Sequence, residues 1–407
     1  MSPGSARYRE IAYYCVATHL GGAERSLLDL VTRVGEHTRG WYRPWLILPK
    51  ADGPLVDAVR AAGLSHTVLP MPSALLSLSR ARPLRALVVS AVAWPMLRAY
   101  LARLRRLLDE RQPALLHTTG IKCHVLSTRL GRRTPLLWHL RDIMPNDATR
   151  ALLRRYAVHP FVHVLSNSYA TANAFQPDAE HPSVVSNGID TEVFTPGDGS
   201  AFRAEAGAPP GVPLIGALGV LQRGKGIDSF LQMAAEVLRG GLDARFAVVG
   251  DEIYDTGRDR GLRRELEDLA ERLGLADRVH FAGFRRDSVQ VLRGLDVLVS
   301  ASTHPESFGR VLVEAMACGV PVAASAIGGS LEIVTDRDSG RLFPPGDVPA
   351  MARAVTELCT DPELRAGCIA RGRERVLRLY DVERYVAGVV RAYDRVLQPT
   401  ADSYTAS

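Results

Sequence analysis

Short apolar runs alternate with longer amphipathic stretches along almost the whole of this 407-residue chain. A strand buried on both faces is a short apolar run, and an amphipathic stretch with a 3.6-residue period is a helix. The alternation is therefore typical of parallel sheets whose strands are connected by helices. It predicts helices that include Leu262–Leu273 and Ser288–Leu295, and strands at Ile11–Ala17, Trp45–Pro49, Ala114–His117, Leu136–Leu140, Val162–Ser166, Leu214–Leu218, Arg245–Val249, Val279–Ala282, Val297–Ser300 and Val320–Ala324.

The strands fall into two series, separated by a turn and a loop. Asn187-Gly188 is a strong turn dipeptide, and Pro196 to Ser200 has loop composition. We expect an α/β fold of two doubly wound Rossmann-like domains, residues 1–190 and 191–380, that face a cleft. Residues 381–407 would form a helix over Val382–Leu397 that packs back toward the first domain, followed by a loose tail, with Met1–Arg9 also loose. In such folds ligands bind at the carboxyl ends of the strands.

The absence of long apolar runs and of paired cysteines argues against several classes of protein. No apolar run approaches the roughly 20 residues that span a bilayer, and the polar N-terminus carries no signal-peptide core, so we expect a cytoplasmic protein. The five cysteines include no Cys-x-x-Cys pair, which argues against a disulfide framework or a zinc site.

The net charge of +6 fits an anionic ligand, a nucleic acid or an acidic membrane surface. No nucleic-acid motif accompanies the arginines, which are spread along the chain, so we expect no nucleic-acid partner. The basic, partly apolar region formed by Ser79–Arg85 and then Arg98–Arg106 could touch an anionic membrane and a lipid-linked acceptor, although a solvated helix face explains it equally well.

The most informative segment runs from His304 to Ser325. Its Ser307-Phe308-Gly309 turn precedes a predicted helix that ends at Gly319, with Pro321 just beyond. Glu306 precedes the helix, and Glu314 lies about two turns along it on a similar face. Backbone N–H groups at a helix start bind phosphate, and flanking carboxylates accept hydrogen bonds from sugar hydroxyls. A nucleotide-sugar diphosphate has both kinds of group.

Other strand ends carry further candidates. Gly21-Gly22 permits close approach to a phosphate or a sugar, although the pattern by itself favours a plain tight turn. Arg223 and Lys225 stand between a strand and a helix, where cations meet a diphosphate. Lys225 is also one of only three lysines among 50 basic residues. Phe284 follows a strand in a loop that could hold a nucleotide base or be purely structural.

The last candidates are histidines and a pair of aspartates. His139 lies at the end of a predicted strand that points toward the cleft, with His117 and His124 as competitors. Asp336 and Asp338 have a spacing that could hold a divalent cation, but their polar surroundings favour a turn, so we predict no metal site.

Taken together, these segments resemble the retaining GT-B glycosyltransferases of family four, also called glycosyltransferase group 1. The resemblance covers nearly the whole chain and is strongest from Pro305 to Pro321, where Glu306 and Glu314 match the paired-glutamate motif of the family. Gly328-Gly-Ser-Leu-Glu332 and the interdomain Asn187-Gly-Ile-Asp190 also match. One departure is Val220, where many relatives carry an arginine; Arg223 could supply that cation instead.

The resemblance implies a role for each matching residue. Glu306 would contact the donor sugar, Glu314 the ribose hydroxyls, and the backbone N–H groups of Phe308 and Gly309 the sugar or diphosphate. Lys225 would neutralise the departing phosphate, and His139 matches the cleft histidine of the first domain. Phe281-Ala-Gly-Phe284 matches the base-binding loop. No metal or other cofactor is implied.

The predicted activity is a metal-independent, retaining transfer of a hexosyl group from a nucleotide-sugar, most simply a UDP-sugar, to an acceptor hydroxyl. The acceptor is a small molecule, glycan or lipid-linked sugar of a bacterial glycan, glycolipid or natural-product pathway. Two alternatives remain, a UDP-sugar epimerase of the same fold and a non-catalytic nucleotide-sugar-binding protein.

Overall fold

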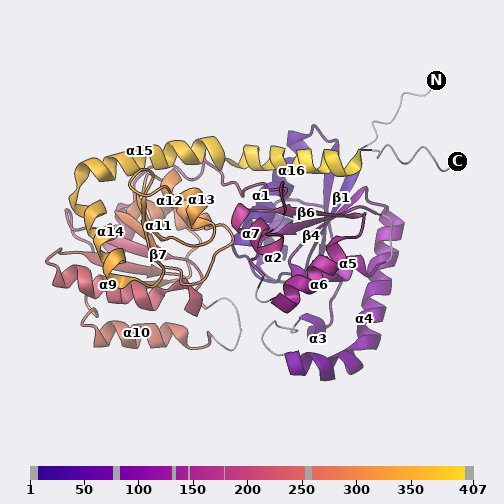
Figure 1. Cartoon of the computed structure of the whole chain (residues 1–407), viewed down its shortest axis with the longest axis horizontal. Coiled ribbons are helices and arrows are strands. Elements are labelled where there is room, and N and C mark those ends of the chain that lie inside the picture. The colour runs from indigo at the N-terminus through magenta and orange to yellow at the C-terminus, as the bar shows by residue number, and fades with distance from the viewer. Residues whose placement is uncertain are drawn as a thin grey trace. The chain divides into compact units, whose positions relative to one another are not determined.

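The computed structural model describes residues 8–76, 83–130, 134–144, 147–177, 179–252 and 259–398, and for residues 83–93 the backbone alone. The chain divides into two units, residues 1–188 with 383–407, and residues 189–382. Each unit contains one parallel six-stranded sheet (Figure 1).

The sheet of the first unit has the order β3-β2-β1-β4-β5-β6. Its strands are β1 (Arg9–Cys15), β2 (Tyr42–Leu48), β3 (His66–Val68), β4 (Leu115–Thr119), β5 (Leu136–Leu140) and β6 (Val162–Ser166). Its helices are α1 (Gly22–His37), α2 (Pro54–Ala61), α3 (Ser73–Leu76), α4 (Pro83–Arg111), α5 (Ile121–Thr128), α6 (Asp147–Ala157), α7 (Tyr169–Phe175) and, from its second residue on, α16 (Val382–Leu397).

The sheet of the second unit has the order β12-β11-β10-β7-β8-β9. Its strands are β7 (Leu214–Leu218), β8 (Arg245–Val249), β9 (Val279–Gly283), β10 (Val297–Ser300), β11 (Val322–Ser325) and β12 (Arg341–Phe343). Its helices are α8 (Ser200–Glu205), η1 (Arg223–Lys225), α9 (Ile227–Arg239), α10 (Leu262–Arg272), α11 (Ser288–Gly294), α12 (Arg310–Ala317), α13 (Ser330–Ile333), α14 (Val348–Thr360) and α15 (Pro362–Leu379).

Both sheets have the strand order of doubly wound Rossmann-like domains, as predicted. Chain direction across the sheet reverses between β1 and β4 in the first unit and between β7 and β10 in the second. Ligands of such folds bind beyond the carboxyl ends of the strands at this switch point. The loops that follow β1, β4, β7 and β10 are therefore the places to look for a site.

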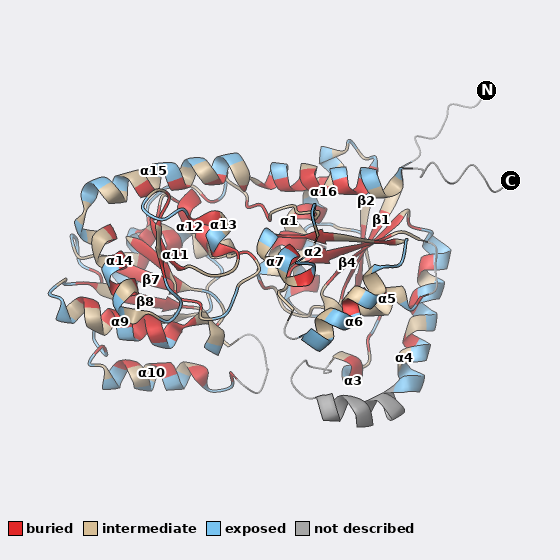
Figure 2. Ribbon diagram, in the orientation of Figure 1, coloured by how far each residue is buried: buried red, intermediate tan, exposed pale blue. Residues whose placement is uncertain are grey.

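Alternation of side chains builds two apolar layers in the second unit. On one face of the sheet, Ile215 and Phe246 pack in a buried cluster with Phe230 and Met233 of α9. On the other face, Leu214 and Leu298 pack with helix residues such as Leu312 of α12. Figure 2 shows the strands buried and the flanking helices exposed along their outer sides. The period-2 pattern of the strands thus places apolar groups in both layers.

In the first unit the same alternation separates apolar from polar side chains. Ala12 and Tyr14 of β1 and Trp138 of β5 belong to a large apolar cluster that includes Leu104 of α4. The intervening residues point to the opposite face, where Tyr13 of β1 contacts Tyr393 of α16. The C-terminal helix therefore packs against the sheet of the first unit.

The predicted strands are all present, and β5, β6, β7, β8 and β10 have the predicted bounds. The edge strands β3 and β12 were not predicted, because three residues are too few to show a period. The prediction that Arg9 is loose is wrong, since it begins β1 and its N–H donates to the carbonyl of Trp41 at 2.8 Å. Residues 1–7 and 399–407, and Ser79 to Arg82 of the basic region, lie outside the described residues.

Candidate functional site

The loops at the switch point of the second sheet bring two predicted residues together. Lys225 ends η1, which follows β7, and Glu306 lies in the loop that follows β10. Lys225 Nζ lies 2.9 Å from Glu306 Oε1, and both side chains are partly exposed, at 34% and 20%. An ion pair at the carboxyl edge of the sheet is thus built from two residues 81 positions apart.

Glu306 is held as a carboxylate. Burial alone would raise its pKa, but the charge of Lys225, a hydrogen bond from the Ser302 hydroxyl and a hydrogen bond from Lys225 outweigh burial. The pKa of Glu306 therefore lies below its ordinary value. Near neutral pH the site presents a carboxylate next to an ammonium group.

Glycines let the loops of the site lie against one another. Gly226, directly after Lys225, has a positive φ of 67°, and a Cβ there would lie 2.0 Å from the carbonyl oxygen of Ala301. Gly328, also with a positive φ, would place a Cβ 2.5 Å from the carbonyl oxygen of Glu306. The N–H of Gly329 donates to that same oxygen at 2.9 Å. The backbone around the ion pair is therefore fixed on two sides by glycine contacts.

Helix α12 starts next to this loop and carries the second glutamate. Gly309 forms its N-cap with a left-handed φ of 93°. Phe308 is buried and lies edge-on to the ring of Tyr380 at 5.6 Å. Ser307 is half-buried. The predicted helix is confirmed, and its C-terminus ends as expected, with Gly319 donating to the carbonyl of Met316 at 3.1 Å.

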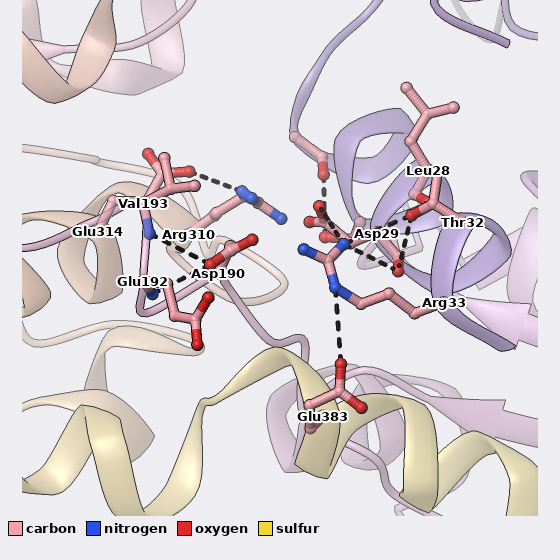
Figure 3. A network of polar contacts seen from close by, with 12 residues as sticks. Leu28, Asp29, Thr32, Arg33, Asp190, Glu192, Val193, Arg310, Glu314 and Glu383 are labelled. Carbon is pink, nitrogen blue, oxygen red and sulfur yellow. Dashed lines mark hydrogen bonds and ion pairs between the residues drawn. The ribbon is translucent and has the colours of Figure 1, made fainter. Parts of the chain in front are cut away.

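Glu314 forms an ion pair that the sequence analysis missed. Arg310, one turn earlier on α12, donates through Nε to Glu314 Oε1 at 2.6 Å (Figure 3). Both side chains are nearly buried, at 13% and 9% exposed. Their i,i+4 spacing was the available signal. The glutamate predicted to hold ribose hydroxyls is thus already oriented by a cation of its own helix.

Arg223 and Phe284 are two further candidates of the second unit. Arg223 pairs with Glu265 of α10 at 2.8 Å, with both side chains about half exposed. Phe284 follows the left-handed Gly283 at the end of β9, and about half of its surface is exposed. Asp336 accepts from Arg341 at 2.9 Å and Asp338 pairs with Arg371, which confirms the predicted turn.

In the first unit, Gly21 is the N-cap of α1 and Gly22 is the first residue of that helix. The N–H of Gly21 donates to Glu24 Oε2 at 3.0 Å. Burial raises the pKa of Glu24, a residue that was not singled out from the sequence. The carboxylate closes the first turn of α1 beside the carboxyl end of β1.

His139 lies on β5, one residue before its end, and is completely buried. Its Nδ1 lies 3.2 Å from His117 Nε2 and 3.3 Å from an Arg141 guanidinium nitrogen. Burial and then the charge of Arg141 hold the pKa of His139 well below its ordinary value, so the ring is neutral at pH 7. Arg141 was not predicted, although it stands two residues after His139, the spacing of side chains on one face of a strand.

The described part of the chain includes no helix long and apolar enough to cross a membrane. Met96 and Trp94 of α4 are among its exposed large apolar residues, at 42% and 50%. Arg98, which is also exposed, follows Trp94 by four residues and so lies on the same side of α4.

Two family models together match most of the chain. The model for glycosyl transferases group 1 matches residues 199–375, and the model for glycosyltransferase family 4 matches residues 20–193. The group 1 match includes every strand of the second sheet, and the family 4 match includes every strand of the first sheet except β1. The chain therefore belongs to the group 1 glycosyltransferases with the GT-B fold.

Particular relatives give the range of the family. A D-inositol 3-phosphate glycosyltransferase of Stackebrandtia nassauensis is 34% identical over 58% of this chain and 54% of its own length. A 2-deoxystreptamine N-acetyl-D-glucosaminyltransferase of Streptomyces fradiae is 38% identical over 44% of this chain and 41% of its own. The chain thus spans about half the length of the curated relatives it matches.

Solved structures extend the similarity over almost the whole chain. The crystal structure of Anabaena HepE in complex with UDP and glucose has a TM-score of 0.79 and 25% identity, and covers 95% of this chain and all of its own. A sucrose-phosphate synthase of Thermosynechococcus elongatus has a TM-score of 0.77 at 21% identity, covering 95% of this chain and 99% of its own, which supports the fold alone.

Proposed function

We propose that this chain is a retaining glycosyltransferase that moves a sugar from a nucleotide-sugar, a UDP-sugar in particular, to an acceptor hydroxyl. The observation that carries the proposal is the Lys225–Glu306 ion pair of 2.9 Å at the switch point of the second sheet. Family membership and the UDP-bound HepE structure support the donor class. The second unit would bind the donor and the first unit the acceptor.

The charges of the site suit a departing diphosphate. Breaking the bond between sugar and diphosphate makes the phosphate more negative and the sugar more like an oxocarbenium ion. A cation in place before the reaction stabilises that charge in the transition state more than in the ground state. We assign this role to Lys225, aided by the positive end of the α12 dipole at Phe308 and Gly309. Glu306 would face the sugar and hold Lys225 in position.

The nucleoside would be bound farther from the reacting bond. We assign the ribose hydroxyls to Glu314, which Arg310 orients at 2.6 Å. The half-exposed ring of Phe284 offers a surface for a base. Arg223, which pairs with Glu265, is assigned as a second cation for the phosphates. Gly21, Gly22 and His139 belong to the first unit and are assigned to the sugar and acceptor side.

In this proposal the leaving group explains why the transferred sugar keeps its anomeric configuration. The departing phosphate oxygen takes the proton of the incoming hydroxyl on the face from which it leaves, so the bond to the acceptor forms on that same face. The only charged partner this step needs is the cation that stabilises the phosphate, which is why we propose metal-independent chemistry.

Incubation with a panel of UDP-, GDP- and ADP-sugars and pooled hydroxyl acceptors tests this function. We expect UDP release that requires a UDP-sugar, persists in EDTA, and gives a product with the anomeric configuration of the donor by NMR. An inverted product would refute the retaining mechanism. A new sugar epimer formed from the UDP-sugar alone would favour the epimerase, and binding without transfer or hydrolysis would favour the sensor.

We further propose that the protein is cytoplasmic and contacts membranes peripherally through α4. The exposed Trp94 and Arg98, which lie four residues apart and so on the same side of α4, carry this proposal, since aromatic and basic groups together favour an anionic membrane surface. Co-flotation with phosphatidylglycerol vesicles, but not with phosphatidylcholine vesicles, is the expected result. Trp94→Ser should weaken it, whereas Trp41→Ser, which replaces another half-exposed tryptophan of the first unit, should leave it unchanged.

A further inference from the structure

A chain of buried polar side chains links the C-terminal helix to His139. Tyr13 OH lies 2.9 Å from Tyr393 OH, and Tyr393 OH lies 2.7 Å from His117 Nδ1. His117 Nε2 in turn lies 3.2 Å from His139 Nδ1. This hydrogen-bond chain joins β1, α16, β4 and β5, and the four side chains that form it are all completely buried.

Arg141 fixes the direction of every hydrogen bond in this row of buried side chains. A guanidinium only donates, so His139 Nδ1, 3.3 Å from Arg141 Nη2, must be an acceptor. His117 Nε2 then donates to the same Nδ1, which leaves His117 Nδ1 as an acceptor. Tyr393 must therefore donate to His117, and Tyr13 to Tyr393. Arg141 is itself held by Asn187, whose Oδ1 accepts from Nη1 at 2.7 Å, and by the hydroxyl of Tyr385.

These hydrogen bonds determine whether the other ring nitrogen of His139, Nε2, carries a proton. Burial and the charge of Arg141 lower the pKa of both histidines far enough to keep them neutral. A neutral ring whose Nδ1 accepts carries its proton on Nε2. Nε2 is buried and has no hydrogen-bond partner among the described residues. Leaving a buried donor unpaired is costly, and a ligand oxygen that accepted from it would offset that cost.

We infer that Arg141 and the Tyr13–Tyr393–His117 chain are positioning residues that hold His139 as the Nε2–H tautomer, a hydrogen-bond donor to an oxygen of the bound substrate. This inference rests on the proposed function for the identity of the substrate, but the tautomer is a property of the protein alone. It assigns the C-terminal helix a task in the site: from more than 240 residues away in the sequence, Tyr393 contacts His117 and Tyr385 contacts Arg141.

Long-range ¹H–¹⁵N correlation spectra of ¹⁵N-histidine-labelled protein without substrate test the tautomer directly. His139 is assigned by the signal lost in His139→Gln. We expect a protonated Nε2 and an unprotonated Nδ1 at pH 7, unchanged in Arg141→Lys, which keeps a donor. Arg141→Leu should convert part of the population to the Nδ1–H form. A protonated Nδ1 in the wild type would overturn the inference.

Kinetics test the positioning role with a milder change. Tyr393→Phe removes one hydroxyl, and loss of one such hydrogen bond should lower kcat by up to about tenfold while donor KM changes little. Tyr14→Phe is the matched control, because Tyr14 OH also pairs with a buried tyrosine, Tyr100, at 3.0 Å on the opposite face of β1. Equal losses of kcat in both variants would show that the hydrogen-bond chain has only a structural role.

The outcomes separate this inference from the proposed function. A wild-type protein that transfers sugar but shows an Nδ1–H His139 refutes the tautomer and leaves the function intact. A protein that shows the Nε2–H tautomer but releases no nucleotide from any donor refutes the function, while the hydrogen-bond chain stands.

Discussion

The carboxyl edges of the two sheets differ in the charge and the burial of their polar side chains. At the edge of the second sheet, Lys225 and Glu306 are charged, partly exposed and joined by an ion pair. Near the edge of the first, His139, one residue before the end of β5, and His117, in the middle of β4, are neutral, completely buried and joined by a hydrogen bond. This chain thus combines a partly exposed ion pair in one unit with a buried, neutral hydrogen-bond network in the other.

This difference predicts how substitutions in each region affect the reaction and the stability of the fold. Charge in a partly exposed loop acts through proximity, so its removal should change the reaction more than the fold. A buried neutral network acts through its hydrogen-bond geometry, so its alteration should change stability and tautomer as well as rate. Four experiments can break or sharpen this contrast.

The largest effect is expected for Lys225→Ala. Loss of one preorganised charge in a site of this kind costs about 3 kcal/mol, or roughly a hundredfold in kcat. Donor affinity, measured by calorimetry, should fall far less than turnover. Lys50→Ala, at an exposed lysine after β2, should leave both unchanged. Equal losses in binding and turnover would contradict a role for Lys225 in the transition state.

The buried pair on α12 should rank next. Arg310→Met leaves Glu314 buried without its cation, which should cost about 3 kcal/mol in the free energy of unfolding. Arg263→Met is the matched control, because Arg263 and Glu267 form an i,i+4 pair at 2.9 Å that is more than a third exposed. That pair should contribute about 0.3–0.5 kcal/mol. Urea titrations that give equal losses would show that burial does not distinguish the two.

Gly226→Ala tests whether backbone contact positions Lys225. A Cβ at Gly226 would overlap the carbonyl of Ala301, so we expect a loss of about 1–3 kcal/mol in stability together with a fall in kcat. Gly274 also has a positive φ, of 70°, but its Cβ would meet nothing within 4 Å. Gly274→Ala should therefore cost less than Gly226→Ala and leave kcat unchanged. The contact is unimportant if the two variants behave alike.

The smallest effect is the pH dependence of the first unit. The folded pKa of His139 lies below its unfolded value of about 6.5, so the unfolded chain binds the extra proton as pH falls below 6.5. Stability from this group is complete above pH 6.5 and falls with decreasing pH, by at most about 1.4 kcal/mol per unit. His139→Gln should remove that slope between pH 6.5 and 5.

The fluorescence of tryptophan measures this unfolding in the right place, because all four tryptophans of the chain belong to the first unit. The difference between wild type and His139→Gln cancels the contribution of other groups, among them Glu24, whose raised pKa acts in the opposite direction. Parallel pH profiles for the two proteins would mean that His139 is not held neutral.

Much of the fold could be predicted because its signals are local. A buried parallel strand such as β5 or β8 is a short apolar run, and α12 is bounded by Gly309 and Gly319, whose left-handed φ values suit glycine. The fold class and the loops after β7 and β10 followed from that pattern. The three-residue strands β3 and β12 could not be found, since pairing with a neighbour, not their own sequence, makes them strands.

By itself, the sequence determined the alternation of strands and helices, the glycine positions, and the paired glutamates at Glu306 and Glu314. Each depends on the chemistry of neighbouring residues, which fixes the local backbone. Only the tertiary structure decided which side chains meet: Arg310 with Glu314, Arg141 with His139, and Tyr393 with His117, 276 positions away. Such distant contacts depend on packing of the whole unit, because a hydrogen bond or ion pair forms only where the completed fold places both partners within about 3 Å.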